Sequence, residues 1–312
     1  MAEITEFYYN SANGKNKIRA KKYIPETTIK GIVQIAHGIA EHIDRYDTFM
    51  TFLADNGYIA VANDHLGHGK SISGKEDLGA FSENDGWNTV VKDMVSLHDT
   101  ITAEYSGVPY VMFGHSMGSF LTRTYIIDYP DKYDAVIISG TGHQSSLMVT
   151  AGKLLSKFLV RKNGYRSDGK QLNDIAFGSY LNKIENPKTD FDWLSTDDST
   201  VKKYIDDPYC GFIAQTGLYA DMMTGSNYVT NMNNIRRMNL DKPVYFMSGK
   251  EDPVGEYGKG VEKAYNCFKI AGVKDVMIRL YPGGRHEMLN ETNSTVVFND
   301  ILNWLNAKVC KG

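Results

Sequence analysis

Short apolar runs recur along this chain, and most of them end at Gly, Asn, Asp or Ser. Runs of this length are typical of strands that are buried on both faces of a parallel sheet. Two earlier runs flank the turn signal Asn13-Gly14-Lys15, which predicts an antiparallel hairpin at one edge of the sheet. The patterns together predict about eight strands, at residues 4–9, 17–24, 32–36, 58–62, 110–113, 135–138, 244–247 and 276–281.

Between these runs, apolar residues recur with helical spacing in five segments: residues 46–56, 86–105, 119–128, 261–271 and 295–309. Strands that alternate with helices predict a doubly wound, mostly parallel α/β sheet, with ligands bound at the carboxyl ends of the strands. The alternation stops once, and we see no run typical of a buried strand between residues 142 and 240. We therefore expect a core made of residues 1–141 and 241–312, with residues 142–240 inserted above the sheet as a helical cap.

The amino-acid composition limits the classes of molecule that this protein is expected to bind. The chain has 312 residues, of which 42% are hydrophobic, so it can bury the large core of a single enzyme-sized unit. Its 34 Lys and Arg residues nearly balance 37 Asp and Glu residues. No long run of one charge occurs, so nothing favours a nucleic-acid partner, and a neutral or weakly charged small molecule fits better.

The three cysteines, Cys210, Cys267 and Cys310, are far apart and form no CxxC or Cys/His spacing, so the sequence suggests neither a disulfide framework nor a zinc site. The first ten residues lack a basic segment followed by an apolar one, and no stretch reaches the apolar length of a membrane span. We expect a cytoplasmic protein. The oligomeric state stays open.

The central chemical signal is Gly114-His115-Ser116-Met117-Gly118, a G-x-S-x-G motif. A predicted strand precedes it and an amphipathic helix follows it. In this context the glycines permit a sharp turn that lifts the serine hydroxyl above the sheet, at the start of the helix. The motif predicts that Ser116 is the nucleophile of an α/β-hydrolase fold.

A serine hydroxyl is a weak nucleophile, so it needs a base, and the base needs an acid that orients it. In this fold the acid and the histidine follow the serine in that order. His286 is the one histidine beyond the strand that must carry the acid, and it lies in a loop after the last predicted strand. Asp252 follows the preceding strand and is our candidate acid, with the adjacent Glu251 as the competing carboxylate.

Acyl transfer also requires donors for the developing oxyanion. The backbone N–H of Met117, directly after the serine, is the first candidate. The second comes from the loop after the strand at residues 32–36, where we choose the amide of Ile39 over that of Ala40. His37 precedes a glycine turn, and we expect it to brace this loop rather than act as a base.

Two short motifs resemble sites of other kinds, a phosphate-binding loop and a metal site. Gly69-Lys70-Ser71 resembles the end of a P-loop, but Asp64 stands where the phosphate-cradling turn needs its first glycine. His65 and His68 lie beside Asp64, yet no further ligand cluster completes a metal site, so a structural role is expected for this segment. We predict neither a metal nor another cofactor.

Three stretches together resemble the monoacylglycerol lipase and lysophospholipase branch of the α/β-hydrolases: residues 37–46 (HGIAEHIDRY), residues 64–71 (DHLGHGKS) and the G-x-S-x-G motif. The likeness is weak across the cap. It implies the same triad and the amides of Ile39 and Met117, and it implies that Glu41 and Arg45 help to bind the glycerol end of a substrate. An internal ion pair that stabilises the loop is the alternative for these two residues. Leu289 stands where mammalian-type relatives carry a second histidine, which puts glycerol specificity in question.

Residues 146–162 combine apolar residues with Lys153, Lys157, Arg161 and Lys162 at helical spacing. Such a helix can meet lipid or line an acyl-chain tunnel, or it can pack on the body with its lysines in water.

The predicted function is hydrolysis of an acyl ester, such as a monoacylglycerol or lysophospholipid, through an acyl-enzyme. The alternatives are a short-ester, aromatic-ester or thioester hydrolase, or an aminopeptidase, with the same triad. A non-catalytic receptor would not require an intact triad.

Overall fold

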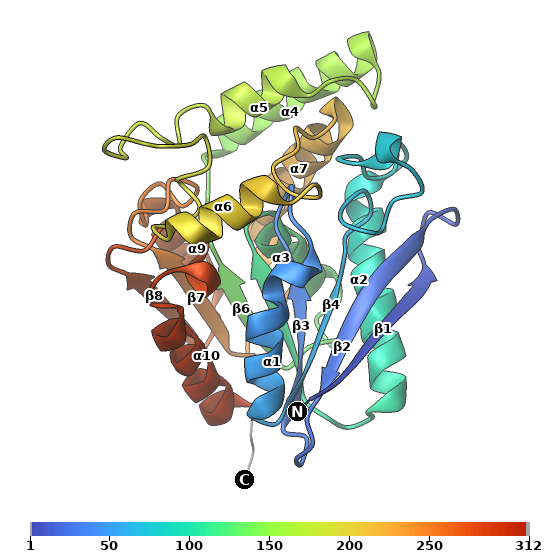
Figure 1. Cartoon of the computed structure of the whole chain (residues 1–312), viewed down its shortest axis with the longest axis vertical. Coiled ribbons are helices and arrows are strands. Elements are labelled where there is room, and N and C mark those ends of the chain that lie inside the picture. The colour runs from blue at the N-terminus through green and yellow to red at the C-terminus, as the bar shows by residue number, and fades with distance from the viewer. Residues whose placement is uncertain (1, 310–312) are drawn as a thin grey trace.

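The computed structural model describes residues 2–309. Its eight strands form one sheet in the order β1-β2-β4-β3-β5-β6-β7-β8 (Figure 1). Strands β1 and β2 form an antiparallel hairpin, β2 pairs antiparallel with β4, and all remaining pairs are parallel. The strands are β1 (Glu3–Asn10), β2 (Lys17–Ile24), β3 (Gly31–Ala36), β4 (Tyr58–Asn63), β5 (Tyr110–His115), β6 (Ala135–Ser139), β7 (Val244–Gly249) and β8 (Val276–Tyr281). The predicted mostly parallel sheet of eight strands is confirmed.

Five central strands, β3 to β7, are buried at every residue. Because side chains alternate along a strand, Ile32 of β3 faces one hydrophobic core and Val33 faces the other. The prediction that β8 is buried on both faces was wrong. It is an edge strand with exposed residues at alternate positions, and Met277 is 38% exposed.

Helices cover both faces of the sheet. Those on one face are α1 (Asp47–Asp55) and α10 (Ser294–Lys308), and those on the other are α2 (Gly86–Glu104), α3 (Met117–Asp128) and α9 (Lys259–Ala271). The parallel strands run upwards in Figure 1, away from both chain ends, so their carboxyl ends lie beneath the segment that follows β6.

Between β6 and β7, the described chain contains only helices among its regular elements: α4 (Ser146–Asn163), α5 (Lys170–Phe177), α6 (Asp198–Asp206), α7 (Thr216–Val229) and α8 (Met232–Ile235). Helices α4 and α5 lie highest in Figure 1. Helix α4 packs on α7, which in turn packs on α2 and α3, while α8 packs on α9. The inserted segment is thus anchored to one helical layer of the core.

Among the described residues, no helix is both long and apolar enough to cross a bilayer. Cys210 and Cys267 are free thiols, and Cys310 lies outside the described residues.

Candidate active site

Ser116 occupies the turn between β5 and α3, with φ 54° and ψ −123°. This left-handed backbone conformation is costly for a residue with a side chain, and it is a feature of sharp strand-to-helix turns. The Ser116 amide donates to the carbonyl of Ser139 at 3.0 Å, which ties the turn to the end of β6. At Gly118 a Cβ would lie 2.0 Å from the carbonyl oxygen of Ala36, so only glycine fits there. Ser116 is half-buried between fully buried neighbours.

His286 and Asp252 meet at the carboxyl ends of β7 and β8. The Nδ1 atom of His286 lies 3.1 Å from both carboxylate oxygens of Asp252, and both side chains are almost fully buried. Two further donors hold the carboxylate: the Ser248 hydroxyl at 2.8 Å and the Val254 amide at 2.9 Å. Glu251, the competing acid, is exposed on the same loop. The carboxylate that faces the histidine is therefore that of Asp252.

In the Asp252–His286 pair, each group shifts the pKa of the other in the direction that favours its charged form. Burial alone would raise the pKa of Asp252, but His286, Ser248 and the Val254 amide together lower it below its ordinary value. Burial alone would lower the pKa of His286, but the Asp252 carboxylate outweighs burial and raises it above 6.5. Because Nδ1 faces a carboxylate, the proton of the neutral ring belongs on Nδ1, and Nε2 carries the lone pair of a base.

Gly140 is the point where the turn at Ser116 and the His286 loop approach each other. A Cβ at Gly140 would lie 3.0 Å from ring atoms of both His115 and His286. These two rings lie 4.6 Å apart between centroids. Within the described residues, no hydrogen bond joins the Ser116 hydroxyl to His286, and catalytic hydrogen bonds are often long before substrate binds.

One predicted oxyanion donor, the amide of Met117, follows the serine directly, and the other, the amide of Ile39, belongs to a loop that passes close to the serine. Met117 is the first residue of α3, so its N–H has no acceptor inside the helix. The loop after β3 passes close to the serine, since a Cβ at Gly38 would lie 3.0 Å from the Cβ of Ser116. In the described part of the chain the amide of Ile39 donates to no protein acceptor. Ala40 takes the left-handed φ of 54° in the same turn.

Glu41 and Arg45 form a buried ionic cluster with Glu287. Glu41 accepts hydrogen bonds from the Gly38 amide at 2.5 Å and from the Tyr46 hydroxyl at 2.9 Å. Arg45 bonds to Glu41 at 2.8 Å and makes two bonds to Glu287, at 2.5 and 2.6 Å. These contacts engage both side chains within the protein, which favours the loop-stabilising interpretation over direct contact with glycerol.

His37 connects the loop after β3 to the loop after β4. Its Nε2 accepts a hydrogen bond from the amide of His65 at 2.9 Å, and its Nδ1 lies 2.7 Å from the Gly38 carbonyl. Burial lowers the pKa of His37 to about 3, so the ring is neutral. Asp64 accepts from the amides of Ile43 and Lys70. Both residues therefore brace loops, as expected for His37 and for the segment at residues 64–71.

A cavity of about 450 Å³ lies between the loop after β3 and the helical segment that connects β6 to β7. Its walls are mainly apolar and aromatic, and they include Ile39, Phe177, Leu181, Trp193, Phe212 and Tyr219. Trp193 also reaches the catalytic histidine candidate, because its ring lies 5.2 Å from that of His286 and its carbonyl accepts the His286 amide at 3.4 Å. A ligand in this cavity would therefore lie beside the residues described above.

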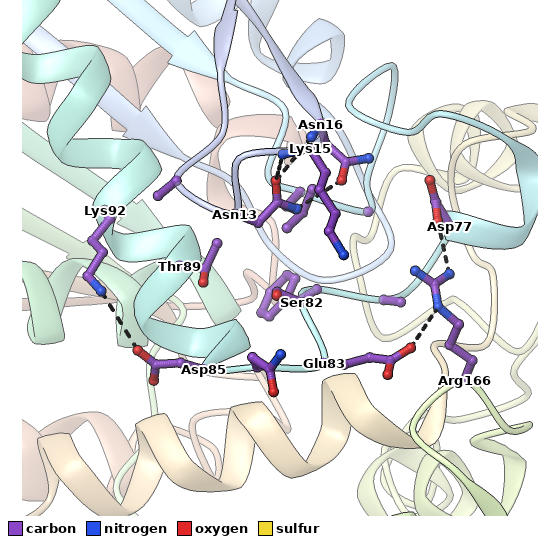
Figure 2. A pocket seen from close by; sticks show the side chains of 16 residues that line it. Asn13, Lys15, Asn16, Asp77, Ser82, Glu83, Asp85, Thr89, Lys92 and Arg166 are labelled. Carbon is purple, nitrogen blue, oxygen red and sulfur yellow. Dashed lines mark hydrogen bonds and ion pairs between the residues drawn. The ribbon is translucent and has the colours of Figure 1, made fainter.

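A second cavity, of about 470 Å³, lies between the β1–β2 turn and the start of α2 (Figure 2). Figure 2 shows five of its charged residues in ion pairs: Arg166 points toward Asp77 and Glu83, and Lys92 toward Asp85. None of Ser116, Asp252 and His286 lines either cavity, but Ile39 and Trp193, whose ring contacts that of His286, line the first cavity and not the second. We therefore assign the chemistry to the cavity beside Trp193.

Sequence reasoning missed several residues that support the site. Ser248 stands four residues before Asp252, a spacing that could have marked it as a partner of the carboxylate. Glu287 follows His286 directly, but its partner Arg45 is 242 residues away. Trp193 belongs to the segment between β6 and β7, where no local pattern indicated contact with the histidine. Leu289, which the sequence analysis had singled out, is buried and borders a small void beside Glu41.

A serine on a strained strand-to-helix turn, beside a buried Asp–His pair at the carboxyl ends of a mostly parallel sheet, defines the α/β-hydrolases. The model of the family described as "Serine aminopeptidase, S33" matches residues 27–293. The chain belongs to this family and is a serine hydrolase.

The most informative relatives cover nearly the whole chain. Monoacylglycerol lipase of Mycolicibacterium smegmatis is 28% identical over 91% of this chain and 90% of its own length. Human monoglyceride lipase is 25% identical over 91% of this chain and 85% of its own length. Among solved structures, a thermostable carboxyl esterase from Bacillus coagulans in complex with glycerol is 29% identical, with a TM-score of 0.92 over 99% of both chains. The comparisons confirm the fold and the monoacylglycerol lipase branch.

Proposed function

We propose that this enzyme hydrolyses carboxylic esters of the monoacylglycerol type, with Ser116, Asp252 and His286 as the catalytic triad and the amides of Ile39 and Met117 as the oxyanion hole. The observation that carries the proposal is the Asp252–His286 pair, held by Ser248 beside the apolar cavity. The named lipases and the glycerol-bound esterase support the choice of substrate class.

The reaction proceeds through an acyl-enzyme. His286 Nε2 takes the proton of the Ser116 hydroxyl as the oxygen attacks the ester carbonyl, and the two amides stabilise the negative oxygen. His286 then protonates the leaving alcohol. In the second half, the same nitrogen activates water, which releases the acid and restores the serine. Asp252 orients the ring and stabilises its cation in both halves.

The cavity suits the acyl part of such a substrate. Its volume falls within the range of small-molecule sites, and aromatic and aliphatic side chains dominate its walls. Residues 142–240 act as the cap in this proposal, because they contribute most of these walls, including Phe177, Trp193 and Phe212.

We extend the proposal to a surface that meets lipid. Helix α4 leaves apolar side chains in solvent, with Leu147 80%, Leu154 66% and Phe158 60% exposed. Its buried residues, such as Val149 and Leu159, face the body instead. An exposed apolar stripe with Lys and Arg beside it is typical of helices that lie in a membrane interface. Such a surface would give the cap access to micelles or vesicles.

The experiment that tests the proposal compares the parent protein with Ser116→Ala. Both are incubated with a fluorophosphonate probe, with p-nitrophenyl esters of two to sixteen carbons, and with a monoacylglycerol. We expect labelling and turnover by the parent alone, with the highest kcat/KM on medium or long chains. A folded parent that neither labels nor turns over any ester would overturn the triad.

The family description leaves an aminopeptidase as the second candidate. An aminoacyl p-nitroanilide belongs in the same assay, since an aminopeptidase would cleave it better than a long-chain ester. Vesicle co-sedimentation of Leu154→Gln/Phe158→Gln, beside the parent, tests the lipid surface; equal binding by both proteins would contradict that role for α4.

A further inference from the structure

Three side chains from distant parts of the chain meet where the cap crosses the loop after β3. They are His42, from that loop, and Asp207 and Cys210, from the segment after α6. One possible ligand atom of each lies within 4.8 Å of the other two. The Nε2 atom of His42 is 2.8 Å from Oδ2 of Asp207. The sequence hides this cluster, because His42 and Asp207 are 165 residues apart.

The local backbone orients the two cap residues toward His42. The Cys210 amide donates to the Asp207 carbonyl at 3.0 Å, which closes a turn that brings the two side chains together. The Asp207 Oδ1 atom accepts the Tyr209 amide at 2.8 Å, so Oδ2 is the oxygen that faces the imidazole. His42 and Cys210 are buried, whereas the Asp207 side chain is 29% exposed. The cluster is thus closed on the protein side and reachable from solvent at the carboxylate.

The carboxylate of Asp44 lies beside the His42 nitrogen that does not face Asp207. The Nδ1 atom of His42 faces Asp44 Oδ2 at 3.6 Å. In metal sites, the histidine nitrogen that does not bind the metal commonly faces a carboxylate, which fixes the tautomer and the ring orientation. Arg19 and Lys21 bind this same carboxylate and hold it in place.

We propose that His42, Asp207 and Cys210 bind a thiophilic divalent cation such as Zn²⁺. One imidazole nitrogen, one carboxylate oxygen and one thiolate are all zinc ligands, and water would supply the fourth. Ligands of a tetrahedral zinc ion lie roughly 3.3 to 3.6 Å apart. The gap between His42 and Asp207 must therefore widen by about 0.5 Å, while the Cys210 sulfur must approach by no more than about 1.2 Å. The Cys210 thiol gives up its proton on binding, and so does Nε2 of His42, which donates to the Asp207 carboxylate in the metal-free protein.

A bound cation would connect the cap to the loop that carries Ile39. The amide of Gly211, next to Cys210, already donates to the carbonyl of Ala40 at 3.0 Å. Gly211 and Ala40 both line the cavity beside the candidate active site. Metal bonds to His42 on the loop and to Asp207 and Cys210 on the cap would add to this hydrogen bond, so the cation would fix the cap against the loop.

The test uses the full chain, freed of metal with a chelator. Cd²⁺ is titrated while the thiolate-to-metal charge-transfer absorbance is followed, and Zn²⁺ then competes for the same site. We expect one equivalent to bind the parent, and Cys210→Ser to abolish the absorbance. Zn²⁺ affinity should fall more than about tenfold in Cys210→Ser and in Asp207→Asn, which keeps the thiol. Cys267→Ser, which removes a cysteine outside the cluster, should bind like the parent.

Thermal unfolding gives a second readout that does not depend on catalysis. Zn²⁺ should raise the midpoint of the parent and of Cys267→Ser but not that of Cys210→Ser, whereas Mg²⁺, which prefers oxygen ligands, should leave all three unchanged. Equal Zn²⁺ affinity in the parent and both cluster variants, or an absorbance lost with Cys267 instead of Cys210, would overturn the site. Neither result would bear on the proposed ester hydrolysis.

Discussion

Replacing Arg45 by Met tests how much the buried ionic cluster contributes to stability. Arg45 makes three charge-assisted hydrogen bonds, and its guanidinium lies 4.8 Å from the centre of the Tyr204 ring. Its side chain is 11% exposed, while those of Glu41 and Glu287 are each 4% exposed. Met keeps much of the aliphatic stem but leaves two carboxylates buried without a cation. Breaking a buried pair in this way costs about 3–5 kcal/mol of the free energy of unfolding.

The assay is equilibrium urea unfolding at pH 7.5, with Arg166→Met as the matched control. Arg166 also pairs with two carboxylates, those of Asp77 and Glu83, but its side chain is 45% exposed. Exposed pairs are screened by water, so the control should lose less than about 1 kcal/mol.

The pH dependence of the stability lost in Arg45→Met tests the role of the ionic cluster more sharply. Burial alone would raise the pKa of Glu287, but Arg45 outweighs burial and lowers it. The contribution of this pair to the parent's stability is therefore fully present above the unfolded-state pKa of Glu287, and it is lost as the pH falls through the lower, folded-state pKa. In Arg45→Met, burial raises the pKa of Glu287, so this carboxylate takes up a proton at a higher pH than in the parent. Its protonation removes the cost of burying an unpaired charge in the variant. The deficit of Arg45→Met should shrink between pH 7.5 and pH 5. A deficit below about 1 kcal/mol at pH 7.5, or one that grows on acidification, would refute the reasoning.

Three further outcomes are expected. Asp252→Asn should fold normally and lower kcat about 10⁴-fold on a p-nitrophenyl ester, because the histidine tautomer is no longer fixed, whereas Glu251→Gln should keep full activity. The kcat/KM of the parent should fall on acidification with a midpoint above pH 6.5, since the base must be neutral and Asp252 raises the pKa of His286; a midpoint below 6 in a pH–rate profile would contradict this. Gly118→Ala should prevent folding or sharply lower the thermal midpoint, because its Cβ would overlap the end of β3, while Gly107→Ala, which meets no atom within 4 Å, should cost about 1 kcal/mol of backbone strain.

Local patterns were sufficient to predict most of the fold. Each central strand is a continuous apolar run, and each side of the Ser116 turn carries the glycine that the backbone requires, so both could be recognised without knowledge of distant contacts. The order of the elements then placed Asp252 and His286 at the same edge of the sheet. The exposed face of β8 could not be predicted, because an apolar run does not reveal whether another element covers it.

Apart from the Ser248–Asp252 contact, the contacts that hold the site join distant parts of the chain and could not be predicted from local patterns. Glu287 and Arg45 are far apart in the sequence, and charged residues at such separations give no pattern that marks them as partners. The sequence of residues 142–240 contains even less information about such contacts, since the side chains of this segment meet the core through tertiary packing alone. Trp193 therefore looked like any other aromatic residue of the insertion, although its ring contacts His286.

The insertion leaves the sheet after β6 and returns at β7, and these two strands are hydrogen-bonded neighbours. Because these strands are parallel, the end of β6 and the start of β7 lie at opposite edges of the sheet, a fixed distance of about one strand length apart, whatever the connecting chain contains. The entropy lost on closing a connection grows only with the logarithm of its length, so expanding one of 20 residues to about 100 costs roughly 1.4 kcal/mol. The packing of α7 on α2 and α3 can offset that loss. The β6–β7 connection is thus a position where one cap can be exchanged for another at small thermodynamic cost to the sheet.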